Sequence, residues 1–465
     1  MRQTTDKNTP LSFPIKTATS CQFKWTWSTL FLSTGTSSSC HRCRGWDVST
    51  DIKNFHNHPG KIHDREKMLD GQWPGNGCEY CKKIEVAGGE SERTSYINDM
   101  AYAPPELLDD PKALHTTPRI LEVYFTNVCN QACAYCSPFF SSLIQAEIKK
   151  HGPLEGEYDL MGFHSRPGYE DRKKQFWEWM EEKSQHLFDF QILGGEPMYQ
   201  PEFVECLNFF EDKEHPRLNW KIFSNLKHDP VKFKEKIDRV SKLIDKGALK
   251  SFEIVCSVDN WGPQAEFARY GMELPEWEEN FNTILNDKNV KISIHSTISV
   301  VTLCTMGDLY AKVAVWDRQK RIFFGWNTVA NPTFMSPEIL GHYAGKYFDE
   351  LVEVVKTIPS VRKDLISYLG GFKTQVTKHE VDPVRLMKLS NYLDRLDERR
   401  KTNWRELYPW LEVIIQRECN GVEVETDFSG YKATNWDWLE QDPSGKLEAV
   451  VGNFRDKSDQ DKSVI

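Results

Sequence analysis

The sequence predicts an α/β protein whose main unit is a partial (β/α)6 barrel of the TIM type, and two observations lead to this fold. Between residues 119 and 330, short runs rich in β-branched and aromatic residues alternate with longer stretches at helical spacing, as in βα units around a parallel sheet. The six units are fewer than the eight of a closed barrel. The predicted strands are 121–125, 188–193, 220–224, 252–258, 290–298 and 321–328.

Helices are expected between these strands, at 172–187, 201–212, 231–246, 275–286 and 306–319. One face of the third helix carries apolar residues, among them Phe233, Ile237, Val240 and Ile244. In a sheet of parallel strands, the functional groups belong at the carboxyl ends of the strands. The fold therefore predicts where a site should lie.

Composition limits the classes of function. The 465 residues suffice for about three domains, and contents of 39% hydrophobic and 27% charged residues indicate a soluble globular protein. A net charge of -9 argues against general electrostatic binding to nucleic acid or to an anionic membrane. No run approaches about 18 apolar residues, and the first residues lack an apolar signal core, so the cytoplasm is the expected location.

Residues 1–20 are expected to form a flexible arm, and residues 21–100 a small cysteine-rich module. The run 24–32 is rich in aromatic and β-branched residues and is followed by a glycine-bearing turn, which predicts a β-hairpin. Without a secretion signal, thiols indicate metal or redox chemistry rather than disulfides. The module contains five of them: Cys21, Cys40, Cys43, Cys78 and Cys81.

Two kinds of metal site are compatible with these five cysteines. Two Cys-x2-Cys pairs, 40–43 and 78–81, could form a zinc ribbon, although the gap between them exceeds the usual ribbon spacing. Alternatively, Cys21, Cys40, Cys78 and Cys81 hold an iron–sulfur cluster and Cys43 is spare. The spacing alone favours zinc.

A second cysteine motif follows the first strand of the predicted barrel. Cys129, Cys133 and Cys136 have Cys-x3-Cys-x2-Cys spacing. A 4Fe–4S cluster normally takes four thiolates, so three of them leave one iron open to a small molecule. The competing interpretation is a zinc knuckle, but structural zinc needs a fourth Cys or His close by, and none follows before His151.

The second strand ends in Gly194, Gly195, Glu196 and Pro197. Paired glycines let the backbone approach a ligand closely, and a carboxylate can accept hydrogen bonds from an ammonium group. An ordinary strand-to-helix turn, with Pro197 at the first helical position, would explain the same residues. The position of this motif beside the three-cysteine loop, at the ends of strands one and two, makes the combination specific.

Together these motifs resemble the radical S-adenosylmethionine (SAM) enzyme superfamily over residues 119–330. The resemblance implies that Cys129, Cys133 and Cys136 bind a 4Fe–4S cluster whose fourth iron is chelated by SAM. It also implies that residues 194–197 contact the methionine amino group. The reduced cluster would then cleave SAM to a 5'-deoxyadenosyl radical, which abstracts hydrogen from a substrate.

The resemblance extends to further SAM contacts at the ends of strands three and four. The segment 224–226 is similar to a Thr-Asn-Gly turn, with Leu226 where glycine is common, and Arg269 resembles an arginine that pairs with the SAM carboxylate. Plain solvation or loop capping is the alternative for each residue. The candidates are Ser224, Asn225, Ser257, Asp259 and Arg269.

The N-terminal module resembles the twitch or SPASM auxiliary-cluster module of radical SAM enzymes, including phage-encoded twitch proteins. That module usually follows the barrel, whereas here it precedes it. The resemblance implies an auxiliary iron–sulfur cluster at Cys21, Cys40, Cys78 and Cys81, with Cys43 as a further candidate and zinc as the alternative metal.

Residues 331–455 are predicted to form a helical extension that caps the barrel mouth, with helices at 336–356, 384–396 and 404–417, and residues 456–465 a disordered tail. The charge run 394–401 is interpreted as a solvated helix face.

The expected function is that of a cytoplasmic radical SAM enzyme, in the host cytoplasm if it is phage-encoded. Its expected substrate is a peptide or protein side chain, and its electron donor a protein such as a flavodoxin or ferredoxin. A small-molecule or nucleotide-like precursor is the alternative substrate. The rival from another class is a zinc-binding interaction protein on a degenerate barrel.

Overall fold

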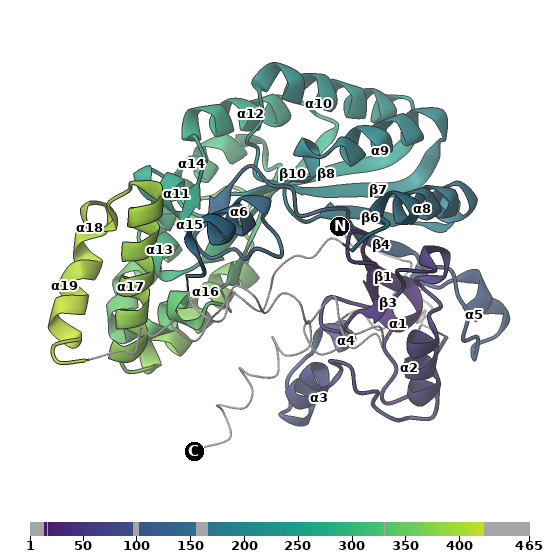
Figure 1. Ribbon diagram of the computed structural model, residues 1–465, viewed down its shortest axis with the longest axis horizontal. Helices are drawn as coiled ribbons and strands as arrows, with labels where there is room; N and C mark the ends of the chain where they lie inside the picture. Colours follow the sequence, from purple (N-terminus) through teal and green to yellow (C-terminus); the bar gives the residue numbers. More distant parts are fainter. Residues whose placement is uncertain (1–13, 16, 96–101, 155–165, 330, 423–465) are drawn as a thin grey trace.

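A computed structural model describes residues 14–15, 17–95, 102–154, 166–329 and 331–422. Its centre is a nine-stranded sheet with the order β11-β10-β8-β7-β6-β4-β1-β2-β3 (Figure 1). The strands predicted for the barrel are confirmed in number, order and parallel direction, while the curvature of a partial barrel stays a prediction. They are β4 (Ile120–Tyr124), β6 (Asp189–Leu193), β7 (His215–Ser224), β8 (Leu249–Ser257), β10 (Val290–Ile298) and β11 (Ile322–Thr328).

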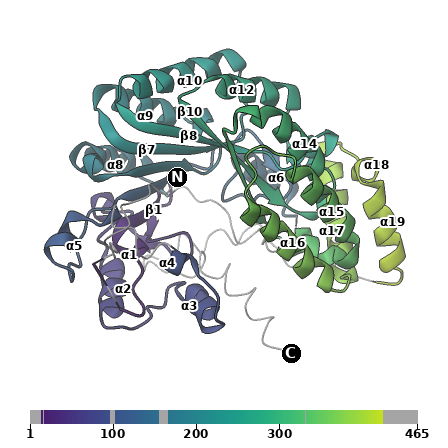
Figure 2. The same ribbon diagram turned by 180° about the vertical axis from the view of Figure 1, so that it is seen from behind.

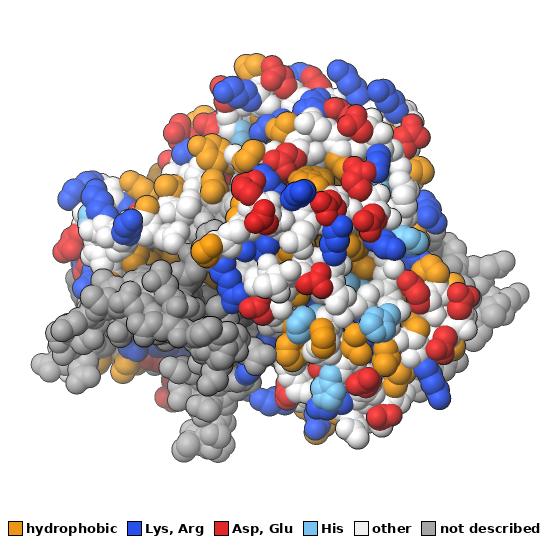
Figure 3. All heavy atoms as spheres, turned by 45° about the vertical axis from the view of Figure 1, so that its right-hand side comes forward, with side chains coloured by type: hydrophobic (Ala, Val, Ile, Leu, Met, Phe, Trp, Pro, Cys, Tyr) orange, Lys and Arg blue, Asp and Glu red, His pale blue; other side chains and the backbone are white. Residues whose placement is uncertain are grey.

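Helices cover one side of this sheet (Figures 1 and 2). Their apolar stripes face the strands, and on α10 the buried residues are Phe233, Ile237, Val240 and Leu243. Ile244, predicted for this face, is only half-buried. Acidic and basic side chains lie intermixed over the outer surface (Figure 3). The helices are α8 (Tyr169–Lys183), α9 (Pro201–Asp212), α10 (Pro230–Asp245), α12 (Leu274–Asn286) and α14 (Met306–Trp316).

The strands alternate between this helix-covered face and a polar face, as β10 illustrates. Its residues Val290, Ile292 and Ile294 are buried, whereas Ser293 and His295, which point to the other face, are half-buried. The connection after β6 is a 3-10 turn, η4 (Pro197–Tyr199), with Pro197 at its first position. This is the turn that the sequence offered as the alternative to a ligand contact. A separate two-stranded sheet joins β5 (Ala132–Cys133) to β9 (Arg269–Tyr270). The remaining short helices of this region are α6 (Ser142–His151), η3 (Ser184–His186), α11 (Pro263–Ala268), α13 (Val300–Leu303) and η5 (Asp317–Gln319).

The N-terminal cysteine-rich module continues the same sheet. The predicted hairpin is confirmed, because β1 (Trp27–Phe31) pairs antiparallel with β2 (Thr36–Ser38). The other edge of β1 pairs parallel with β4, with Phe31 opposite Tyr124. This module therefore shares its backbone hydrogen bonding with the predicted barrel. Its other elements are α1 (Phe23–Thr26), β3 (Trp46–Asp47), η1 (Ile52–Asn54), α2 (Pro59–Leu69), α3 (Glu79–Val86) and α4 (Glu92–Ser95), and α5 (Pro105–Asp109) follows the module.

The C-terminal extension is helical through its described part, as predicted, but its boundaries differ. The expected helix 336–356 is broken where Gly341 adopts φ +51°, and α16 carries two glycines that hid it from the sequence pattern. Residues 423–465, which include the predicted tail, and residues 1–13 of the predicted arm lie outside the described residues. The elements are η6 (Thr333–Met335), η7 (Pro337–Ala344), α15 (Gly345–Val355), α16 (Lys363–Lys378), α17 (Pro383–Arg400), α18 (Trp404–Leu407) and α19 (Pro409–Glu418).

Helix α17 packs against the segment that follows the three-cysteine motif. Arg400 forms two bonds of 2.9 and 3.0 Å with Glu147 of α6, and Arg399 donates to the carbonyl oxygen of Gly152 at 2.7 Å. The charge run 394–401 is therefore not simply a solvated face, since Arg400 is buried. The hydroxyl of Tyr392 also donates to the carbonyl oxygen of Ala134, at 2.6 Å. None of the described helices combines the length and the hydropathy needed to cross a membrane.

Candidate functional site

The three-cysteine loop leaves the carboxyl end of β4 and is held at several points. Pairing of β5 with β9 places Cys133 opposite Arg269. On the other side, the hydroxyl oxygen of Ser142 accepts a hydrogen bond of 3.2 Å from the backbone N–H of Cys129. The thiols of Cys129, Cys133 and Cys136 are therefore presented, half-buried, by an anchored loop.

Burial raises the pKa of these three thiols, that of Cys129 to about 12. The thiolate is the form that binds metal, so a bound cation must supply the charge that displaces the protons. Within the described residues, no group of three His, Cys, Asp or Glu side chains is arranged to hold a single metal ion. A cluster needs no common point, because each thiolate binds a different iron. Three thiols are the type of donor that a 4Fe–4S cluster takes.

The glycine turn after β6 packs directly on the cysteine loop. Both glycines adopt positive φ, +85° at Gly194 and +55° at Gly195. A Cβ on Gly195 would lie 2.1 Å from the carbonyl oxygen of Val128, and one on Gly194 would lie 2.6 Å from the ring of Tyr124. The N–H of Glu196 donates to the same Val128 oxygen at 2.9 Å. Only glycine lets the second motif approach the first this closely.

Glu196 is fully buried, and donors from the protein itself surround its carboxylate. Oε1 accepts from the Ser224 hydroxyl at 2.8 Å and from the backbone N–H of Met198 at 3.1 Å, and lies 3.2 Å from Nε2 of His228. Oε2 accepts from the backbone N–H of Asn225 at 2.6 Å. The sequence predicted a carboxylate directed at a ligand ammonium. In the structure this carboxylate ties the end of β6 to the turn after β7.

The turn after β7 also forms hydrogen bonds with the cysteine loop. The side-chain amide of Asn225 donates to Oδ1 of Asn130 at 2.9 Å, and the amide of Asn130 donates to the carbonyl oxygen of Lys227 at 2.7 Å. Leu226 adopts φ +55° and is fully buried, so this turn keeps the left-handed conformation although the residue is not glycine. Sequence reasoning missed Asn130, whose only signal was its place beside Cys129.

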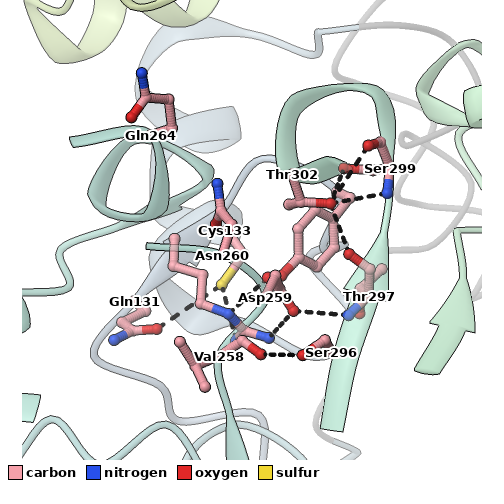
Figure 4. A network of polar contacts seen from close by, with 12 residues as sticks. Gln131, Cys133, Val258, Asp259, Asn260, Gln264, Ser296, Thr297, Ser299 and Thr302 are labelled. Carbon is pink, nitrogen blue, oxygen red and sulfur yellow. Dashed lines mark hydrogen bonds and ion pairs between the residues drawn. The ribbon is translucent and has the colours of Figure 1, made fainter. Parts of the chain in front are cut away.

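Asp259 is the centre of a buried polar network that reaches the cysteines (Figure 4). Nε and Nη2 of Arg269 donate to its two oxygens at 2.8 and 2.9 Å, and the backbone N–H of Thr297 donates at 2.8 Å. The Tyr135 hydroxyl contacts the same carboxylate. Burial opposes the charge of Arg269, but Asp259 outweighs it and holds the pKa of Arg269 well above its usual value. Arg269 thus has an internal partner, and its Nη1 lies 3.8 Å from Sγ of Cys133.

Ser257 ends β8 on the polar face of the sheet, where β10 places His295 directly beside it. Both side chains are half-buried, and burial lowers the pKa of His295 so that the neutral ring is favoured. The sequence pointed to Ser257 but not to His295, because the pairing of β8 with β10 has no local signal. The candidate residues of strands one to four therefore meet at one edge of the sheet.

The five cysteines of the N-terminal module line one hollow. Gly77 makes this possible: its φ is +86°, and a Cβ there would lie 2.1 Å from the carbonyl oxygen of Arg42. Glycine thus lets the loop before Cys78 lie against the backbone leading to Cys43. The sulfurs of Cys40 and Cys43 are 3.5 Å apart.

Cys43 contacts two of the other thiols in this hollow, those of Cys40 and Cys78. Hydrogen bonds from Cys40 and Cys78 and a buried ammonium, that of Lys24 at 3.3 Å, hold the pKa of Cys43 well below its usual value. Burial raises the pKa of Cys21 to about 12. Cys43 is therefore one of the thiols that line the hollow, and its role, spare or ligand, stays a prediction.

The two cysteine sets lie at opposite ends of the sheet. Cys21 precedes the amino end of β1, and Cys40 follows β2, which runs antiparallel to β1 and so ends beside that amino end. Since β1 and β4 are parallel, this is also the amino end of β4. Cys129 follows the carboxyl end of β4. The five residues of β1 span about 13 Å at ~3.3 Å per residue. A group bound by one set therefore does not share a pocket with a group bound by the other.

No protein-family model matches this chain, and a search of curated proteins finds no match. Solved structures do match, and two of them each align with half of the chain. One is TYW1 with a lysine-pyruvate adduct bound, at 17% identity and a TM-score of 0.27, covering 50% of this chain and 69% of TYW1. The other is anSMEcpe with bound AdoMet and the Kp18Cys peptide, at 18% identity and a TM-score of 0.32, covering 50% of this chain and 59% of the other. Alignments this weak carry no argument about function.

Proposed function

We propose that this chain is a radical SAM enzyme with a 4Fe–4S cluster held by Cys129, Cys133 and Cys136. The observation that carries the proposal is the contact of the Gly194–Gly195 turn with the three-cysteine loop. This contact brings together two motifs that are more than fifty residues apart in the sequence. Bound there, the cluster and SAM would supply an electron and a 5'-deoxyadenosyl radical for hydrogen abstraction.

The residues of the chain would act by holding this wall in place. The hydrogen bond between Asn130 and Asn225 links the cysteine loop to the turn after β7. Glu196 holds the same turn by accepting a hydrogen bond from the backbone N–H of Asn225. The pair formed by Asp259 and Arg269 positions Cys133. The backbone groups left at Gly194 and Gly195 are those proposed to face the SAM amino group, while Ser257 is proposed to face its ribose.

We further propose a peptide or protein side chain as substrate, within a partial-barrel, twitch-like enzyme of the cytoplasm that takes electrons from a flavodoxin or ferredoxin. This substrate class rests on the resemblance of residues 21–81 to auxiliary-cluster modules. The alternative substrate, to be tested beside a peptide, is a small molecule or nucleotide-like precursor. The polar face of the sheet, where Lys221 and Glu253 pair at 3.1 Å, supports a polar substrate in either case.

The N-terminal hollow is proposed to hold a second metal centre bound by thiolates, either an auxiliary iron–sulfur cluster or zinc. Its support is the convergence of five cysteines from three separate segments on one hollow. A Cys129→Ala/Cys133→Ala/Cys136→Ala variant leaves only this site. Such a variant should retain about four irons if the site holds a 4Fe–4S cluster, and zinc in place of iron would refute the cluster alone.

Anaerobic reconstitution with iron and sulfide tests the main proposal. Reduced protein with SAM is expected to release 5'-deoxyadenosine, measured by liquid chromatography and mass spectrometry, and Cys129→Ala is expected to abolish it. Cys206→Ala is the matched control, because Cys206 belongs to α9 and its thiol is buried in the core, so its loss should leave the product unchanged. The proposal fails, in favour of a zinc-binding interaction protein, if no iron binds or if Cys129→Ala and wild type release the same amount.

A further inference from the structure

A buried lysine lies against the N-terminal cysteines. Lys24 belongs to α1 and is 2% exposed. Its ammonium donates to Oδ2 of Asp64 at 2.6 Å and to Sγ of Cys43 at 3.3 Å. The carboxylate of Asp64 comes from α2, so the lysine joins two elements and one thiol. Ion pairs this deeply buried are costly to form and need a further reason to be present.

The contact with sulfur indicates what that reason is. A neutral thiol is a weak acceptor, whereas a thiolate accepts a strong, charge-assisted hydrogen bond from an ammonium. The ion pair with Asp64 holds the ammonium in place beside the cysteines that line the hollow, which is where a negative metal–thiolate centre would need a positive charge.

A second buried lysine in the same module shows that burial alone does not bring an ammonium to sulfur. Lys61 of α2 is fully buried, and its three donors go to the hydroxyls of Ser28 and Ser37 and to the carbonyl oxygen of Ser38. These partners are neutral oxygens that lie along the β1–β2 hairpin. Lys61 therefore supports the hairpin, while Lys24 points at the cysteines.

We propose that Lys24 is a positioning residue of the N-terminal metal centre: it donates an N–H···S hydrogen bond to Cys43, which is one of the thiolate ligands, and its buried charge offsets part of the centre's negative charge. The inference rests on the second metal centre proposed above. It makes Cys43 a ligand rather than a spare thiol, and it holds for iron–sulfur and zinc alike, because both are bound as thiolates.

The experiment uses the full chain with Cys129→Ala/Cys133→Ala/Cys136→Ala as background, so that bound metal reports the N-terminal site alone. Iron, zinc and labile sulfide are measured first, and then the half-life of the metal in excess EDTA. Adding K24M should shorten this half-life by about 10-fold or more, the usual effect of losing a partner of a metal ligand. K24R, which keeps a charged donor, should restore most of it, and K61M should change it by less than about 2-fold since Lys61 contacts no sulfur.

Each result has one meaning. Equal half-lives of the bound metal in the background variant and in K24M would overturn the role of Lys24. Equal shortening of the half-life in K24M and K61M would also overturn it, because any buried lysine would then stabilise the module to the same extent. Failure of the background variant to bind any metal would instead overturn the second centre itself. If K24M does not fold, K24M/D64L carries the test, because it removes both charges of the buried pair and leaves none unpaired. The same shortened half-life is expected for it.

Discussion

Gly195→Ala tests whether the contact between the two motifs builds the site. The new Cβ would lie 2.1 Å from the carbonyl oxygen of Val128, while real Cβ contacts are essentially never under 3.0 Å. The turn or the cysteine loop must therefore move by about 1 Å, and a displacement of this size costs catalysis about 100-fold. The positive φ of +55° adds roughly 1–2 kcal/mol of strain.

Two measurements follow for Gly195→Ala. The rate of 5'-deoxyadenosine release by the reconstituted, reduced enzyme should fall by about 100-fold, and the free energy of unfolding in urea should fall by about 2 kcal/mol. The backbone of Val128 cannot yield in the manner of a flexible side chain, which is why both effects are expected together.

Gly371→Ala is the matched control, because a Cβ there meets nothing within 4 Å. Gly371 lies inside helix α16, where alanine is better by about 0.5–1 kcal/mol, so this variant should be slightly more stable and equally active. The reasoning is refuted if Gly195→Ala keeps the wild-type rate and unfolding free energy, since the close approach would then be unimportant.

Three further variants test other contacts. Asn130→Ala removes two hydrogen bonds to the turn 224–228 and should lower the unfolding free energy by about 2 kcal/mol. It should also lower the rate of SAM cleavage, and an unchanged rate would mean that these hydrogen bonds do not support the site. Arg400→Met leaves Glu147 without its partner and should cost about 2 kcal/mol in urea unfolding, whereas no cost would mean that α17 is held elsewhere. Burial raises the pKa of Glu122 above 4.5, so the folded state binds this proton more tightly than the unfolded state, and the contribution of Glu122 to stability falls as the pH rises through the raised pKa. The unfolding free energy of Glu122→Gln should therefore increase relative to wild type as the pH rises above 4.5, and a constant difference between the two proteins would contradict the assignment.

Local periodicity in the sequence was enough for the six parallel strands and most of the helices that cover them. The hairpin around β1 and the turn at Pro197 were also predictable, because their signals lie within a few residues. The break at Gly341 and the helix α16 were not, since glycine weakens the helical pattern in both places. The predicted solvated face at 394–401 was wrong for Arg400, whose partner Glu147 is distant in sequence.

The spacing of Cys129, Cys133 and Cys136 and the glycines beside Glu196 are properties of short segments, and the sequence alone determined them as a candidate site. Only the tertiary structure decided which groups surround them. It paired Arg269 with Asp259, turned Glu196 toward the turn after β7 and set Lys24 against Cys43. The physical reason is that a buried charge must find its partner in space, and such partners come from elements that only the fold brings together.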